Sequence, residues 1–135
     1  MSERILVAVD GSEASARAVE VAARLARVAD GDLSVVHVVE GRPNGEGEVE
    51  AGGPAQELVE EVVAKVGPEG TRATGRTRAV AIGRVAQGIL SEAADLGASV
   101  IVVGSRGLSE SSVLLVGSVT HRLLHLTDRP VIVVP

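Results

Sequence analysis

Short apolar runs alternate with segments of helical periodicity along the whole chain. Continuous apolar runs at residues 5–9, 33–39, 99–103 and 131–134 have the length and the Val and Ile content of buried strands. Between them, apolar residues recur every three or four positions, which predicts amphipathic helices. The apolar positions of the four predicted helices are, in chain order, Ala18, Val21, Ala22, Leu25 and Val28; Leu58, Val62 and Val66; Val85, Ala86, Ile89, Ala93 and Leu96; and Val119, Leu123 and Leu126.

Residues that start or stop regular structure fall at the ends of these segments. Ser12 is a candidate N-cap of the first helix, because its hydroxyl can accept a hydrogen bond from a free backbone N–H. The pairs Asp30-Gly31 and Gly67-Pro68 end the first two helices, and Gly97 ends the third. Residues 41–54 are rich in Gly, Glu and Pro and predict a loop.

Residues 71–82 form a less apolar segment in which arginines alternate with small residues. We interpret it as an edge strand, where charge discourages pairing with another sheet. The complete pattern alternates strands and helices, so it predicts an α/β fold with a parallel sheet and helices on both faces. The length of 135 residues suits one domain, residues 1–135.

The carboxyl ends of the strands are the expected ligand-binding edge of such a sheet, where the winding reverses. The first residues after the predicted strands are Asp10, Glu40, Gly83 and Gly104. We therefore expect site residues at these positions.

The amino-acid composition argues against several classes of function. The net charge of −5 and the absence of Phe, Tyr and Trp argue against nucleic-acid binding, which needs a basic face and stacking platforms. The absence of cysteine excludes disulfides and thiolate catalysis and favours the cytoplasm. No apolar stretch reaches the roughly 18 residues of a membrane span, and no signal-peptide pattern is evident.

A glycine-rich segment follows the fourth predicted strand. It begins Gly104-Ser105-Arg106-Gly107, continues for nine residues and ends in Gly117-Ser118. Glycine lets backbone approach a phosphate without a Cβ clash, and Gly117-Ser118 opens the last helix. The N–H groups and dipole of a helix start favour an anion, so the segment is a candidate phosphate site.

The spacing Gly-x2-Gly-x9-Gly-[Ser/Thr] is the ATP-binding signature of one branch of the universal stress proteins, and the chain resembles that family over nearly its whole length. Further segments carry the resemblance: residues 5–12, 37–39, 103–107, 114–119 and 130–134. The resemblance implies a five-stranded sheet in the order 3-2-1-4-5, of the adenine nucleotide alpha hydrolase-like type. It also implies a homodimer through the edge strand at Val131–Val134.

The resemblance further assigns roles in ATP binding. It implies that Asp10 contacts the nucleoside end, that Ala8, Val9 and Val38 line the adenine pocket, and that ribose and phosphates are held by Gly104, Gly107, Gly117, Ser118 and Val119. Mg²⁺ would arrive with the ATP phosphates, with the Ser118 hydroxyl as a candidate ligand. Arg106 is a candidate phosphate contact, with a solvent-exposed position as the alternative, and Glu110 departs from the small or basic residues common in the family.

Simpler interpretations stay open for several of these residues. The glycines and Asp10 are also typical of ordinary turns. His121 and His125 have the i, i+4 spacing of metal ligands, but no third ligand is evident, so a surface pair is the alternative. His37 lies within a predicted strand and is interpreted as a hydrogen-bonded core residue. No nucleophile elbow, P-loop or Rossmann fingerprint is present.

The sequence thus predicts an ATP-binding protein with a stress-response or regulatory role. It presents no evident general base or arginine finger, so rapid turnover is not expected, although slow hydrolysis stays open. One alternative is a dimeric interaction module that uses no nucleotide. Another is an ATP-using enzyme of a related adenine-binding fold, for which the chain is short.

Overall fold

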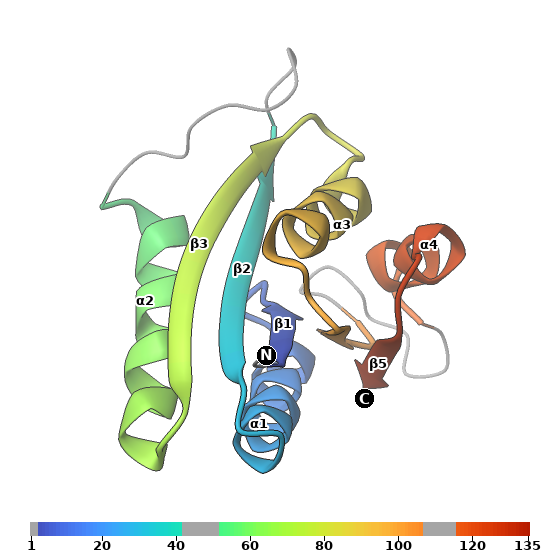
Figure 1. Ribbon diagram of the computed structural model, residues 1–135. Helices are drawn as coiled ribbons and strands as arrows, with labels where there is room; N and C mark the ends of the chain where they lie inside the picture. Colours follow the sequence, from blue (N-terminus) through green and yellow to red (C-terminus); the bar gives the residue numbers. More distant parts are fainter. Residues whose placement is uncertain (1–2, 42–51, 107–115) are drawn as a thin grey trace.

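Strands and helices alternate in the computed structural model, which describes residues 3–41, 52–106 and 116–135 (Figure 1). The strands within these residues are β1 (Arg4–Ala8), β2 (Asp32–Glu40), β3 (Arg72–Val80), β4 (Val100–Gly104) and β5 (Val131–Val134). The α-helices are α1 (Glu13–Val28), α2 (Pro54–Val66), α3 (Val85–Leu96) and α4 (Ser118–Leu126), and a short 3-10 helix at Gly67–Glu69 follows α2.

The strands form one sheet in the order β3-β2-β1-β4-β5. Every neighbouring pair is parallel, and the register pairs Val7 of β1 with Val35 of β2 and with Val102 of β4. The predicted fold class and strand order are therefore confirmed. The order reverses between β1 and β4, so the carboxyl ends of these two strands flank the expected ligand-binding edge.

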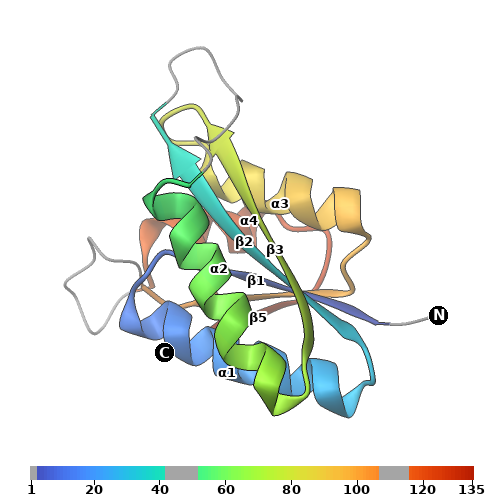
Figure 2. The same cartoon turned by 90° about the vertical axis from the view of Figure 1, so that its left-hand side faces the viewer.

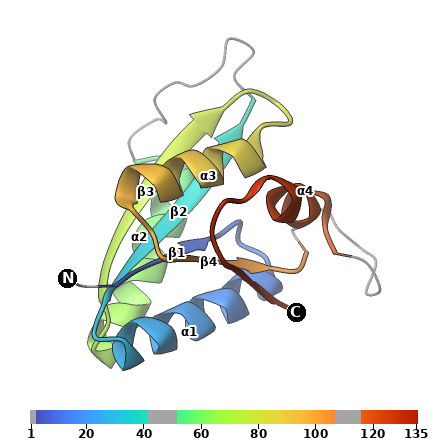
Figure 3. The same ribbon diagram turned by 45° about the vertical axis from the view of Figure 1, so that its right-hand side comes forward.

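Helices cover both faces of the sheet. Figures 2 and 3 show α1 and α2 on one face and α3 and α4 on the other. Successive side chains of β1 enter opposite layers: Ile5 and Val7 pack in the core under α1 and α2, while Leu6 packs in the core under α3. Burial on both faces explains why the central strands read as continuous apolar runs rather than as alternating ones.

The predicted helix ends are largely confirmed. The Ser12 hydroxyl caps α1 by accepting a hydrogen bond from the Ser15 N–H at 3.2 Å. Gly97 ends α3 in the left-handed conformation, with φ of 65°. Val28 differs from the prediction, because it lies in the last turn of α1 with 82% of its surface exposed instead of joining the core.

The two sheet edges are β3 and β5, as predicted. On β3, Arg78 reaches across to α3 and contacts the buried carboxylate of Glu92 at 3.1 Å and the exposed carboxylate of Asp95 at 2.6 Å. On β5, the side chains of Val131, Ile132 and Val133 are half-buried. Among the described residues, no helix combines the length and the apolar character that crossing a membrane requires.

Candidate functional site

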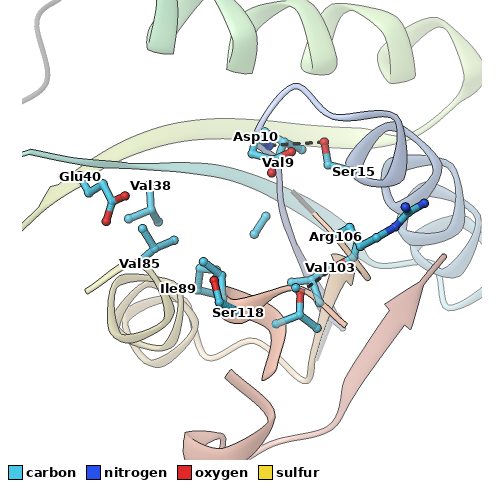
Figure 4. A pocket seen from close by; sticks show the side chains of 15 residues that line it. Val9, Asp10, Ser15, Val38, Glu40, Val85, Ile89, Val103, Arg106 and Ser118 are labelled. Atoms are coloured by element: carbon cyan, nitrogen blue, oxygen red, sulfur yellow. Dashed lines mark hydrogen bonds between the residues drawn. The ribbon is translucent and has the colours of Figure 1, made fainter. Parts of the chain in front are cut away.

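A pocket of about 330 Å³ lies at the carboxyl ends of β1 and β4 (Figure 4). Every predicted site residue that the structure describes contributes to its lining: Ala8, Val9, Asp10, Val38, Gly104, Arg106, Gly117, Ser118 and Val119. Gly107 and Glu110 lie outside the described residues. The sequence therefore predicted which residues come together, while their roles toward a ligand stay predictions.

Other lining residues were given no role in binding from the sequence, namely Ser15, Glu40, Val85, Ile89, Val103 and Thr120. Glu40 is the last residue of β2, a position that the rule for open sheets did single out. Val85 and Ile89 lie one turn apart at the start of α3. Periodicity marks these two as core-facing, but only the packing of α3 against the sheet brings them to the pocket.

Asp10 lies in the turn between β1 and α1 and shapes that turn. Its Oδ1 accepts a hydrogen bond from the Ser12 N–H at 2.9 Å, and its own N–H donates to Ser15 Oγ at 3.4 Å. Gly11 follows with φ of 85°, which favours glycine. The turn interpretation of Asp10 is thus correct, and the same turn holds the residue at the pocket wall.

Gly104 has a packing role that sequence reasoning did not foresee. A Cβ at this position would lie 2.8 Å from the Ala14 carbonyl carbon and 2.9 Å from the Ser15 nitrogen. Glycine is therefore required for the close approach of α1 to β4, whatever ligand the pocket takes. The Gly104 carbonyl also accepts a hydrogen bond from Thr120 Oγ1 at 2.8 Å, which ties α4 to the end of β4.

The first turn of α4 forms one wall of the pocket. Gly117 is the N-cap, with extended backbone and no side chain to cap the helix, and its N–H donates to the Ser105 carbonyl at 2.6 Å. Ser118, Val119 and Thr120 follow it in the pocket lining. The first N–H groups of a helix have no partner within the helix, and its dipole is positive at this end. This wall therefore suits an anion.

The pocket has an apolar end and a polar end. In Figure 4, Val38 and Val85 lie together at one end with Glu40, and Arg106 lies at the other end with its guanidinium directed away from the other lining side chains. Glu40 is exposed, and its Oε2 accepts a hydrogen bond from the Gly83 N–H at 2.8 Å. Such an arrangement can take a flat apolar group at one end and a charged anionic group at the other.

The histidines lie elsewhere in the fold. The rings of His121 and His125 are exposed on α4 with centroids 4.8 Å apart and tilted by 55°. Across the described ranges, no three His, Cys, Asp or Glu side chains gather to hold a metal ion. His37 is half-buried, and its Nδ1 lies 2.7 Å from the Val9 carbonyl oxygen, so the predicted hydrogen bond is confirmed but full burial is not.

A second hollow, of about 490 Å³, lies between α2 and the edge strand β3. Val59 and Val63 of α2 face Gly75 of β3 there, and a Cβ at Gly75 would clash with the Val59 side chain. We refer to this hollow as the α2–β3 groove. No sequence motif predicted a function for it.

Comparison with known proteins establishes the family. The model of the universal stress protein family matches residues 1–135. The chain belongs to the universal stress protein family. A family member from Bacillus subtilis (strain 168), universal stress protein YxiE, is 32% identical over an alignment of 149 positions that covers 99% of each chain.

Two solved structures of universal stress proteins from Archaeoglobus fulgidus share the fold. One is 27% identical, with a TM-score of 0.78, and the match covers 100% of this chain and 95% of that one. The other, solved in complex with dAMP, is 24% identical, with a TM-score of 0.76, over 98% of each chain. Such likeness supports the sheet order described above for this universal stress protein.

Proposed function

We propose that the pocket between β1, β4 and α4 binds ATP, with Mg²⁺ carried on the phosphates. The observation that carries the proposal is the pairing of an apolar end with the start of a helix in one pocket of ligand size. An adenine base needs an apolar slot, and phosphates need N–H donors in a positive field. The pocket lining supplies both.

Each part of the nucleotide has suitable neighbours in the lining. Ala8, Val38 and Val85 would pack against the base, and the Asp10 carboxylate would accept a hydrogen bond from the sugar. The first turn of α4 would attract the phosphates, with the Ser118 hydroxyl as a neutral donor or a magnesium ligand. The guanidinium of Arg106, which points away from the cavity in Figure 4, would have to turn toward the phosphates to contact them. The relative solved with dAMP supports an adenine nucleotide as the ligand class.

We expect a regulatory, stress-related role with at most slow hydrolysis. Both carboxylates of the pocket lining are engaged by backbone, Asp10 with the Ser12 N–H and Glu40 with the Gly83 N–H. These contacts give both carboxylates a role in shaping the pocket, and we assign neither of them as a general base. The stress role and the cytoplasmic location stay predictions from the family resemblance and the composition.

Thermal unfolding with and without ligand tests the proposal. ATP with Mg²⁺ at about a hundred times its dissociation constant should add about 2.7 kcal/mol to the free energy of unfolding. The melting temperature should then rise by about 10 °C, because a domain of 135 residues unfolds with an entropy of about 0.28 kcal/mol/K. Gly117→Val puts a branched side chain at the start of α4 and should abolish the rise. Asp10→Asn should weaken binding while keeping the acceptor for the Ser12 N–H.

The competing function is an interaction module that uses no nucleotide. It predicts an unchanged melting temperature with millimolar ATP, ADP and AMP. A rise that persists equally in Gly117→Val and Asp10→Asn would mean that a nucleotide binds at another site.

A further inference from the structure

Glu40 is a carboxylate in the pocket lining that the phosphate and sugar contacts proposed above do not use. It ends β2, and its Oε2 accepts a hydrogen bond from the Gly83 N–H at 2.8 Å, in the turn between β3 and α3. This bond joins two separate segments of the fold and fixes one oxygen of the carboxylate. Within the described residues, the structure gives Oε1 no hydrogen-bond partner.

The neighbours of Glu40 define which part of a ligand it would meet. Val38 precedes it by two residues on β2, so the two side chains point to the same face of the sheet. Figure 4 shows Glu40 beside Val38 and Val85, at the opposite end of the pocket from Arg106. Glu40 therefore borders the apolar slot, at the end of the pocket opposite Arg106.

We infer that Glu40 is a specificity-determining residue, which accepts a hydrogen bond from the 6-amino group of a purine and disfavours a purine with a 6-oxo group. The inference rests on the proposed nucleotide site. An ionised carboxylate only accepts hydrogen bonds. The adenine amine is a donor at this position, and the 6-oxo group of guanine or hypoxanthine is an acceptor. A 6-oxopurine would therefore place its oxygen against the Glu40 carboxylate. Both groups are acceptors, so no hydrogen bond could form between them.

Three triphosphates distinguish the gain from the 6-amino hydrogen bond from the cost of a 6-oxo group in the wild-type protein. ATP carries the amine, purine riboside triphosphate replaces it with hydrogen, and ITP replaces it with an oxygen acceptor. Dissociation constants of the Mg²⁺ complexes, measured by calorimetry, should rise in that order. ITP should bind at least about tenfold more weakly than ATP, as expected for one mismatched hydrogen bond in a partly closed site.

The variant Glu40→Gln tests the residue itself. Its side-chain carbonyl can still accept from the Gly83 N–H or the adenine amine, while its amide N–H can donate to a 6-oxo group. ATP should bind within about threefold of wild type, and the ATP-to-ITP preference should fall at least about fivefold. Glu20→Gln removes the same charge from an exposed position on α1 and should leave the preference unchanged.

The outcomes distinguish this inference from the proposed function. If the wild-type protein binds none of the three triphosphates, the nucleotide site itself is wrong and the inference falls with it. If it binds ATP but shows no preference over ITP, or a preference that Glu40→Gln leaves intact, only the inference about Glu40 is wrong. A Glu40→Gln variant that changes the ratio of ATP to 2′-deoxy-ATP instead would mean that Glu40 contacts the sugar, which also overturns the inference.

Discussion

Gly104 lies where strand β4, helix α1 and the candidate pocket meet. Its lack of a side chain lets the first turn of α1 pack directly on the end of β4, with Ala14 and Ser15 as the nearest neighbours. Sequence analysis identified this glycine for a different reason, the approach of a phosphate. A glycine in a ligand-binding motif can therefore be required by packing, and stability measurements can separate the two roles.

Gly104→Ala should destabilise the protein even without ligand. The added Cβ would lie 2.8 Å from backbone and side-chain atoms of Ala14, so α1 must shift. Overpacking of this kind costs about 1–3 kcal/mol, which urea denaturation can measure. The control is Gly67→Ala, because Gly67 has helical backbone angles and nothing within 4 Å of its Cβ position. Equal stability of the two variants would contradict the packing role of Gly104.

Helix α3 and strand β3 are joined by a buried charge, Glu92, of which only 1% is exposed. Arg78 of β3 contacts it at 3.1 Å, and Arg76 contacts its other oxygen at 3.4 Å. Glu92 follows Ile89 by three residues and precedes Leu96 by four, so it lies on the same helix face as these apolar residues. That spacing indicates that Glu92 faces the core. It does not indicate that Arg78 of β3 is its partner, because that contact depends on how α3 packs against the sheet.

Replacing Arg78 should therefore lower the free energy of unfolding. Among the described residues, Arg78→Met leaves the buried Glu92 carboxylate only its longer contact to Arg76, and we expect a loss of about 3 kcal/mol in the free energy of unfolding. Arg72→Met is the matched control on the same strand, because the Arg72 pairs with Asp30 and Asp32 are solvent-exposed and contribute little. If urea denaturation found both losses equally small, the Glu92 cluster would have no stabilising role.

Some features of the whole molecule could be predicted from the hydrophobic pattern of the sequence, and others could not. Hydrophobic periodicity predicted the strands, the helices and the α/β class, because buried parallel strands and amphipathic helices have distinct patterns. The strand order came from the family resemblance, since periodicity carries no information about which strands are neighbours. The contributions of Val85 and Ile89 to the pocket depend on how α3 packs against the sheet, so no local pattern revealed them. Glu40, in contrast, lies at a strand end that the rule for open sheets marks.

The edge strand β5 bears on the oligomeric state. It pairs with β4 alone within the described sheet, and its side chains Val131, Ile132 and Val133 are half-buried. The predicted homodimer through this edge would pair its free backbone groups about a twofold axis.

Ile132→Lys should shift a dimer to monomer in light scattering. Val28→Lys changes an exposed position of α1 and should not alter the molecular mass. A monomeric wild-type protein at high concentration would show that this edge does not mediate pairing.

The most direct test of the nucleotide site is a chemical-shift titration of the backbone amides with ATP and Mg²⁺, since a chain of 135 residues is well suited to NMR. The account predicts that the largest shifts fall on Val9, Asp10, Gly104, Ser118 and Val119 at the carboxyl ends of β1 and β4. Val59 and Gly75 in the α2–β3 groove should hardly move. No saturable shift, or shifts centred on the α2–β3 groove, would contradict it.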